Sequence, residues 1–237
     1  MKLEQITGWR DTAFRGPALE MALDHALLDH AIIEGKAFAR FYRWNTPAVT
    51  VGYFHEMESA VQEAPVPVRR YTGGGTVEHG EDITFALIFP PSSSAANASS
   101  ATRYRWIHFE LAKALDASGY RTTRHSEPFK NSTRPCFQHA VSEDLIDPDT
   151  GKKICGGAQR RCKGAVIHQG SLRLPIRLRT LEANWIDHFL NGLSTAQNPL
   201  DENRKTELIA RAIEIERELY GTTSWNERRE AKMKIKF

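Results

Sequence analysis

The chain has 237 residues, of which 41% are apolar and 26% are charged, and its formal net charge at pH 7 is +3. This composition indicates a globular protein, and the small charge and the lack of any apolar run near the roughly 20 residues of a membrane helix argue against nucleic-acid and membrane partners. The N-terminal residues lack the apolar core of a signal peptide, and three cysteines do not suggest a disulfide framework, so we expect a cytoplasmic protein.

The first predicted element is a helix that begins at Pro17 and ends at Gly35. Proline suits a first helical turn, glycine is common just after a last one, and apolar residues between them recur at helical spacing. His25 and His30 interrupt this pattern without any cysteine or second ligand nearby. We expect both histidines at the surface or at an edge rather than in a metal site.

The next segment predicts a β-hairpin. Residues Phe41 to Trp44 alternate as a strand does, Asn45-Thr46-Pro47 has turn composition, and residues Ala48 to Phe54 form a second β-prone run. Gly52 inside this second run suggests the close approach of a ligand or of another part of the backbone.

Residues Arg69 to His79 are the most informative stretch of the chain. Two arginines precede the glycines Gly73, Gly74 and Gly75, and a buried strand is predicted at 83–89. Backbone N–H groups next to arginines are a common way to bind an anionic or acyl-bearing ligand. The spacing fits neither a Walker A loop nor a dinucleotide fingerprint. A glycine turn with two solvated arginines remains the alternative at this point.

Residues 90–175 predict an irregular loop, a helix and an antiparallel meander. The loop covers 90–100, the helix runs from about Thr102 to Gly119, and the meander includes the turn at 147–151. Gly156, Gly157 and Ala158 in the meander are small enough to let a ligand lie close to the backbone. The nearby ammonium of Lys153 could bind a phosphate, polarise an acyl carbonyl or transfer a proton.

The three cysteines do not have metal-ligand spacing, so we expect no metal site. Cys155 lies in an alternating strand and is predicted to be a core residue. Cys136 follows a proline in a region rich in basic residues, which favours a thiolate nucleophile, although a small buried cysteine is the alternative. Beyond residue 175 the pattern predicts two amphipathic helices and a basic end.

Two motifs together resemble the lipoate-protein ligase and octanoyltransferase family, which is related to biotin–protein ligase. They are Arg69-Arg70-x-x-Gly73-Gly74-Gly75-x-Val77-x-His79 and Gly151-Lys152-Lys153-Ile154 followed by Gly156-x-Ala158-Gln159-Arg160. The first helix, the predicted hairpin and Gly170-Ser171-Leu172 also match in the family's order. The resemblance covers about residues 1–175.

The resemblance implies an α+β fold, with a mixed and mostly antiparallel sheet flanked by helices. It implies a catalytic domain over 1–175, with 176–237 as a helical extension packed on it. By analogy, Gly73, Gly74 and Gly75 line an acyl channel, and we expect Gly156, Gly157 and Ala158 among the substrate-binding residues. Arg70 and His79 flank the thioester or acyl-phosphate end, and Lys153 contacts the acyl carbonyl or the phosphate.

The resemblance also implies the reaction. One transferase branch carries its cysteine in a Cys-Phe pair before an acidic-Leu strand, and Cys136-Phe137 stands eight positions before Asp144-Leu145. This favours octanoyl or lipoyl transfer from acyl carrier protein, through a thioester on Cys136, to a lysine of a lipoyl domain or a glycine cleavage H-type protein, without a cofactor. An ATP- and Mg-dependent ligase and a non-catalytic relative that binds lipoyl domains or acyl groups are the alternatives.

Overall fold

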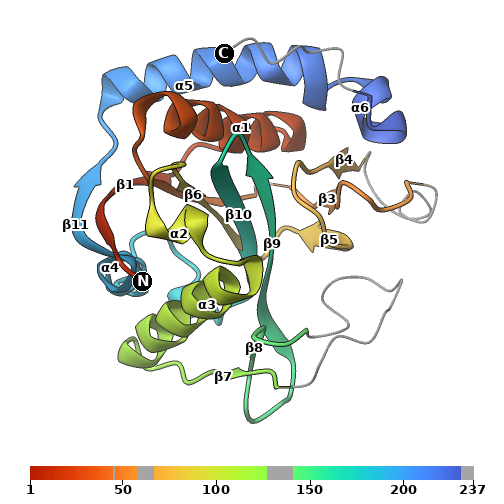
Figure 1. The fold of residues 1–237 in the computed structure, drawn as a ribbon. Coiled ribbons are helices and arrows are strands. Elements are labelled where there is room, and N and C mark those ends of the chain that lie inside the picture. Colours follow the sequence, from red (N-terminus) through yellow and green to blue (C-terminus); the bar gives the residue numbers. More distant parts are fainter. Residues whose placement is uncertain (45, 58–66, 127–140, 231–237) are drawn as a thin grey trace.

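The computed structural model describes residues 1–44, 46–57, 67–126 and 141–230. Its centre is an eight-stranded sheet with the order β11-β1-β2-β6-β10-β9-β8-β7 (Figure 1). The strands are β1 (Leu3–Asp11), β2 (Phe38–Arg43), β6 (Ile83–Phe89), β7 (Thr123–Arg124), β8 (Leu145–Ile146), β9 (Lys153–Cys162), β10 (Ala165–Leu172) and β11 (Ser194–Pro199). Strands β11, β1 and β2 are parallel, and the remaining pairs are antiparallel. The expected α+β class with a mostly antiparallel sheet is confirmed.

Helices cover both faces of this sheet (Figure 1). The helices are α1 (Pro17–Glu34), α2 (Ser94–Asn97), α3 (Ser100–Ala117), α4 (Trp185–Leu193), α5 (Glu202–Ile215) and α6 (Thr223–Arg228), with a 3-10 turn at Ile176–Leu178 and a π-helical turn at Glu216–Tyr220. Helix α1 packs against α5, and α3 packs against α4. None of the described helices is long and apolar enough to cross a membrane.

Strand β6 shows why its sequence is a continuous apolar run. Phe85 and Leu87 belong to one buried hydrophobic cluster, and Ala86 and Ile88 belong to a second cluster with residues of α1 and α5. Successive side chains of a strand point to opposite faces, so a strand covered on both faces must be apolar throughout. The predicted strand at 83–89 is confirmed.

Helix α1 begins and ends where the sequence predicts. Pro17 occupies its first turn, and Gly35 follows it in the left-handed conformation (φ 67°) and donates its N–H to Ala31 O. The prediction that His25 lies at the surface is wrong, because its side chain is buried. Its Nδ1 lies 3.0 Å from the hydroxyl oxygen of Tyr220. The helix is covered by the sheet on one side and by C-terminal helices on the other, which leaves little of its surface exposed.

The predicted hairpin of residues 41–44 and 48–54 is wrong. Strand β2 pairs with β1 and β6 of the large sheet. Strand β3 (Ala48–Val51) instead pairs with β4 (Val68–Arg69) and β5 (Thr76–His79) in a separate three-stranded sheet. The segment between β2 and β3 therefore leads from one sheet to the other. This places the small sheet next to β6, β9 and β10 and opens a space between them.

The predicted antiparallel meander is confirmed by β8, β9 and β10. The irregular loop predicted at 90–100 is wrong in part, since α2 forms there and Ser93 caps it by accepting a hydrogen bond from Ala96 N. Residues 176–230 contribute the strand β11 as well as helices. The division into a catalytic domain over 1–175 and a helical extension over 176–237 stays a prediction.

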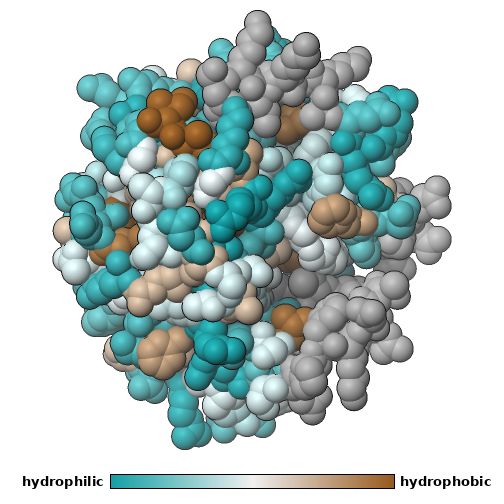
Figure 2. Space-filling model, viewed as in Figure 1, coloured by the Kyte–Doolittle hydropathy of each residue, from teal (hydrophilic) through white to brown (hydrophobic). Residues whose placement is uncertain are grey.

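Figure 2 shows the surface on the side viewed in Figure 1. Hydrophilic side chains cover most of it, and the hydrophobic side chains that reach this face stand apart from one another. Isolated apolar side chains of this kind are normal on a globular protein.

Candidate active site

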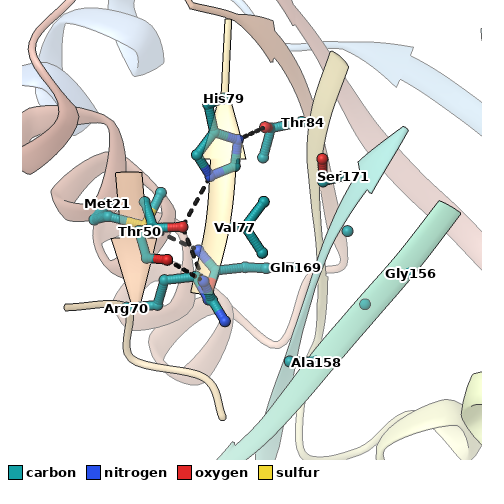
Figure 3. Close-up of a pocket in the computed structure, with 12 residues that line it drawn as sticks. Met21, Thr50, Arg70, Val77, His79, Thr84, Gly156, Ala158, Gln169 and Ser171 are labelled. Atoms are coloured by element: carbon teal, nitrogen blue, oxygen red, sulfur yellow. Dashed lines mark hydrogen bonds between the residues drawn. The ribbon is translucent and has the colours of Figure 1, made fainter. Parts of the chain in front are cut away.

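A pocket with about 450 Å³ of empty space, including its open mouth, lies between the small sheet and the large one. Its walls come from α1, β3, β5, β6, β9 and β10 (Figure 3). The residues that line it are Met21, Thr50, Arg70, Val77, His79, Thr84, Gly156, Gly157, Ala158, Gln169, Gly170 and Ser171. Segments far apart in the sequence therefore meet at one cavity.

Arg70 holds the glycine loop in shape. Its Nη1 donates to the carbonyl and the hydroxyl oxygens of Thr50, both at 2.9 Å, and its Nη2 donates to the carbonyl oxygens of Gly73 (2.9 Å) and Gly75 (2.8 Å). Gly74 between them has a φ of 87°, which favours glycine. These four hydrogen bonds fix the guanidinium beside the pocket.

Arg69 connects the same region to the C-terminal part of the chain. It is fully buried, and its Nη1 donates to three backbone carbonyls, those of Gly52, Tyr53 and His55. Its Nε donates to the carbonyl of Asn226 in α6. Both arginines are thus built into the loops around the pocket. This excludes the alternative of a glycine turn with two solvated arginines.

His79 is held from three sides. Its Nδ1 lies 2.8 Å from Asp82 Oδ2, its Nε2 lies 2.8 Å from Thr50 Oγ1, and its ring stacks on Trp44 at 4.2 Å between centroids. Burial alone would raise the pKa of Asp82, but the adjacent imidazole and the hydrogen bonds from its neighbours lower it to about 2. The carboxylate is therefore ionised at neutral pH, and it orients the His79 ring with Nδ1–H toward it.

The carboxylate of Asp82 also accepts hydrogen bonds from two hydroxyl groups of the pocket wall. Ser171 Oγ donates to Asp82 Oδ2 at 2.6 Å, and Thr84 Oγ1 donates to the same oxygen at 3.0 Å. Two residues before Ser171 on β10, Gln169 Nε2 donates to Asp24 Oδ2 at 2.7 Å, and Gln169 Oε1 accepts from Thr72 Oγ1 at 2.7 Å. These polar groups direct their hydrogen bonds to other protein groups and not into the cavity. The wall therefore presents carbon atoms to a ligand, which suits an acyl chain.

Lys153 lies at the edge of this pocket in an ion pair with Asp144. Its Nζ is 2.8 Å from Asp144 Oδ2, and both side chains are buried. Tyr104 of α3 donates its hydroxyl to the other oxygen, Asp144 Oδ1, and accepts the N–H of Gly157 at 2.9 Å. Burial, the first cause, and Asp144 raise the pKa of Tyr104, so this hydroxyl stays protonated. Asp144 and Tyr104 thus hold the Lys153 ammonium beside strand β9, which lines the pocket.

The small residues of β9 make room for the protein's own side chains. A Cβ added at Gly156 would lie 2.5 Å from Lys153 Cε and 2.6 Å from its Nζ. A Cβ added at Gly157 would lie 2.5 Å from Nε2 of His168. Both glycines also line the pocket. Their size therefore serves the position of Lys153 and His168 as well as the space open to a ligand.

The structure brings most of the predicted site residues together. Arg70, His79, Gly156, Gly157 and Ala158 line the pocket. Lys153 lies against Gly156, and the loop of Gly73, Gly74 and Gly75 is tied to Arg70. Cys136 lies outside the described residues. Cys155 is a buried core residue, as predicted. Within the described ranges, no group of three or more His, Cys, Asp or Glu side chains could hold a metal ion.

Several residues of the site were missed from the sequence. Asp82, Thr84, Ser171 and Thr50 share hydrogen bonds with His79 or with one another, and Tyr104 supports the partner of Lys153. Thr84 and Thr50 are polar residues inside the otherwise apolar strands β6 and β3. Buried polar residues in apolar strands need partners, so this signal could have identified these two threonines.

Comparisons with known proteins show the family of the chain. The family model of the lipoyl protein ligase A/B catalytic domain matches residues 16–232. Octanoyltransferase LipM of Oceanobacillus iheyensis is 31% identical over 90% of this chain and 78% of its own length. The corresponding protein of Geobacillus kaustophilus is 34% identical over 71% of this chain and 66% of its own length.

Solved structures show the same fold at lower identity. A lipoate-protein ligase A bound with ATP superposes with a TM-score of 0.69, at 22% identity, over 96% of this chain and 99% of that one. A putative lipoate protein ligase from T. acidophilum gives 0.70, at 19% identity, over 96% and 100%. The expected ligase-like architecture of the fold is thereby confirmed.

Proposed function

Because the chain belongs to the lipoyl protein ligase A/B catalytic-domain family, we propose that it transfers an octanoyl group to the ε-amine of a lysine on a lipoyl domain. The donor is octanoyl-acyl carrier protein, and Cys136 carries the acyl group between the two partners. The acceptor is a lipoyl domain or a glycine cleavage H-type protein, and the reaction takes place in the cytoplasm. The curated relatives named octanoyltransferase support this reading.

One observation carries the proposal: a pocket with an apolar wall lies beside a buried lysine. The polar groups of His79, Ser171 and Gln169 turn away from the cavity toward protein partners. An octanoyl chain can pack against such a wall without breaking the hydrogen bonds of these polar groups. The ammonium of Lys153, fixed by Asp144, stands at the pocket edge, where it can contact the acyl carbonyl.

The chemistry needs two acyl transfers and no cofactor. The thiolate of Cys136 attacks the thioester carbonyl of the donor, a new C–S bond forms, and the carrier thiolate leaves and takes up a proton. The amine of the acceptor lysine then attacks the enzyme thioester, the Cys136 thiolate leaves, and the amine loses a proton as the amide forms. The first step exchanges one activated thioester for another, and the second converts it to a more stable amide, so no ATP is required.

Lys153 has a defined part in both steps. An ammonium at the carbonyl stabilises the negative charge that develops on its oxygen in each tetrahedral intermediate. Asp144 and Tyr104 keep that ammonium in place before the substrate arrives. Groups fixed in advance toward developing charge contribute factors of about 10² to 10³ in rate.

The test is an octanoyl transfer assay from octanoyl-acyl carrier protein to a lipoyl domain, without ATP. We expect the wild type to be active, and Lys153→Met to lose about 100-fold in rate. Lys152→Met is the matched control, because the adjacent Lys152 is exposed, and it should keep full activity. Transfer that requires ATP and free octanoate or lipoate would instead identify a ligase. Binding of the lipoyl domain without either reaction would identify a non-catalytic relative.

A further inference from the structure

We propose that Asp82 is a specificity-determining residue: it holds the polar groups of the pocket wall away from the cavity, so that the wall distinguishes acyl groups by their chain length. This inference rests on the proposed acyl transfer, and it concerns a residue outside the two sequence motifs. Asp82 is a positioning residue in this account, because it acts through three side chains that line the pocket.

The contacts of Asp82 define its position behind the wall. Its Oδ2 accepts hydrogen bonds from His79 Nδ1 (2.8 Å), Ser171 Oγ (2.6 Å) and Thr84 Oγ1 (3.0 Å). Its Oδ1 accepts the backbone N–H of Gly80 at 3.1 Å. These donors come from β5, β6, β10 and the turn between β5 and β6. Asp82 itself is only 2% exposed.

The three side-chain donors line the pocket (Figure 3). Figure 3 also shows that His79, Thr84 and Ser171 lie at one end of the cavity, and that Gly156 and Ala158 lie along β9, the strand next to that of Ser171. Thr84 Oγ1 also accepts a hydrogen bond from Trp44 Nε1 at 2.8 Å, so the Thr84 hydroxyl can donate its own hydrogen to Asp82. All donors at this end of the cavity therefore converge on one carboxylate.

Removing the carboxylate would leave these donors without an acceptor. Each of the three side chains borders the cavity, so the nearest place for a new partner is a water molecule inside it. An acyl chain would then have to displace that water or leave a donor unbonded. With the acyl carbonyl at Lys153 on the pocket edge, we place the added carbon atoms beside His79, where the family resemblance instead implied the thioester end. Each added carbon atom would then gain less from this end of the pocket than it gains in the wild type.

The experiment compares acyl donors of different length. Transfer of butanoyl, hexanoyl and octanoyl groups from acyl carrier protein is measured as kcat/KM for the wild type and Asp82→Asn. In the wild type we expect kcat/KM to rise about fourfold for each added methylene, the ratio that corresponds to about 0.8 kcal/mol. In Asp82→Asn, whose amide presents its own N–H donors to this cluster, we expect about twofold or less.

The slope with chain length separates this role from a merely structural one. A variant that only lowers the folded fraction reduces kcat/KM by the same factor for every donor and keeps the wild-type slope. Asp149→Asn, at an exposed turn, is the matched control and should keep both rate and slope. Ser171→Ala removes one of the donors that Asp82 accepts from, so this donor no longer requires an acceptor. The variant should keep the wild-type dependence of kcat/KM on chain length, and in the Asp82→Asn background it should partly restore that dependence.

Each outcome decides between the two claims. If the wild type transfers none of the acyl groups, the proposed function fails. If it transfers them and Asp82→Asn has the wild-type slope, or if the wild type itself shows no slope, the inference about Asp82 is overturned. Should Asp82→Asn fail to fold, Asp82→Glu shifts the carboxylate by one methylene and tests the same slope.

Discussion

The two glycine-rich regions of the site use glycine for different reasons. In the first, backbone meets backbone: a Cβ added at Gly52 would lie 1.8 Å from the carbonyl oxygen of Gly74. In the second, Gly156 and Gly157 lie beneath the side chains of Lys153 and His168. A side chain can move where a backbone cannot. Substitutions in the first region should therefore damage the fold, and those in the second should damage the site.

The largest expected effect on stability is that of Gly52→Ala. The new methyl group would overlap the loop that Arg70 holds, and the backbone atoms of Gly73 and Gly74 have no rotamer to escape into. We expect a loss of about 3 kcal/mol or more in the free energy of unfolding by urea, together with loss of activity. Gly16→Ala is the control, since nothing lies within 4 Å of its added Cβ. A change in Gly52→Ala as small as in the control would contradict the close backbone contact.

Gly157→Ala should have a smaller effect. The ring of His168 must move, and it is packed against Phe85, Tyr104 and His108. We expect a loss of about 1–3 kcal/mol. The same substitution in a His168→Ala background should cost less, because the obstructing ring is gone, and a double-mutant cycle measures the difference. Equal costs in both backgrounds would show that the ring is not the obstacle.

His168 also makes this second region sensitive to acid. Burial lowers the pKa of His168 well below 6.5, so the folded chain keeps the ring neutral while the unfolded chain protonates it below about pH 6.5. The stability that this neutral ring contributes is present above pH 6.5 and falls by about 1.4 kcal/mol per pH unit below it. His168→Gln should make the decline between pH 6.5 and 5.5 less steep, and the exposed His188→Gln should not. Part of the decline should remain, because burial also lowers the pKa of His25 and of His108 to about 4. Urea unfolding at several pH values measures both, and equal declines would refute the assignment.

The smallest effect on stability belongs to Gly156→Ala. The atoms in its way are the far end of the Lys153 side chain, which can turn to another rotamer while Nζ stays paired with Asp144, at a cost below about 1 kcal/mol. The displaced ammonium should nevertheless reduce octanoyl transfer about tenfold or more. In a Lys153→Met background, Gly156→Ala should change the rate no further. An additional loss there would mean that Gly156 contributes through something other than the lysine.

Much of the fold could be predicted from the sequence because local signals agree with the tertiary structure. Helix α1 has Pro17 at its start and Gly35 after its end, and β6 is an apolar run bounded as predicted. The hairpin prediction failed because local turn composition says nothing about which sheet a strand joins. Strands β1 and β11 pair in parallel although most of the chain separates them in sequence, so no local sequence pattern predicts that they pair.

The site could be predicted in part for a similar reason. Glycines, arginines and Lys153 stand in motifs, and the structure places them around one pocket. Asp82 and Tyr104 do not stand out in the sequence, because their importance comes from hydrogen bonds to residues distant in the chain or on other strands. His25 was misjudged because a polar residue on a helix looks exposed until a second layer of helices covers it.

Transfer through Cys136 can be observed as the intact mass of the chain after incubation with octanoyl-acyl carrier protein in the absence of ATP. We expect an octanoyl adduct on the wild type that hydroxylamine removes, and none on Cys136→Ser. The same adduct on Cys136→Ser, or no adduct on a wild type that still modifies the lipoyl domain, would contradict transfer through Cys136.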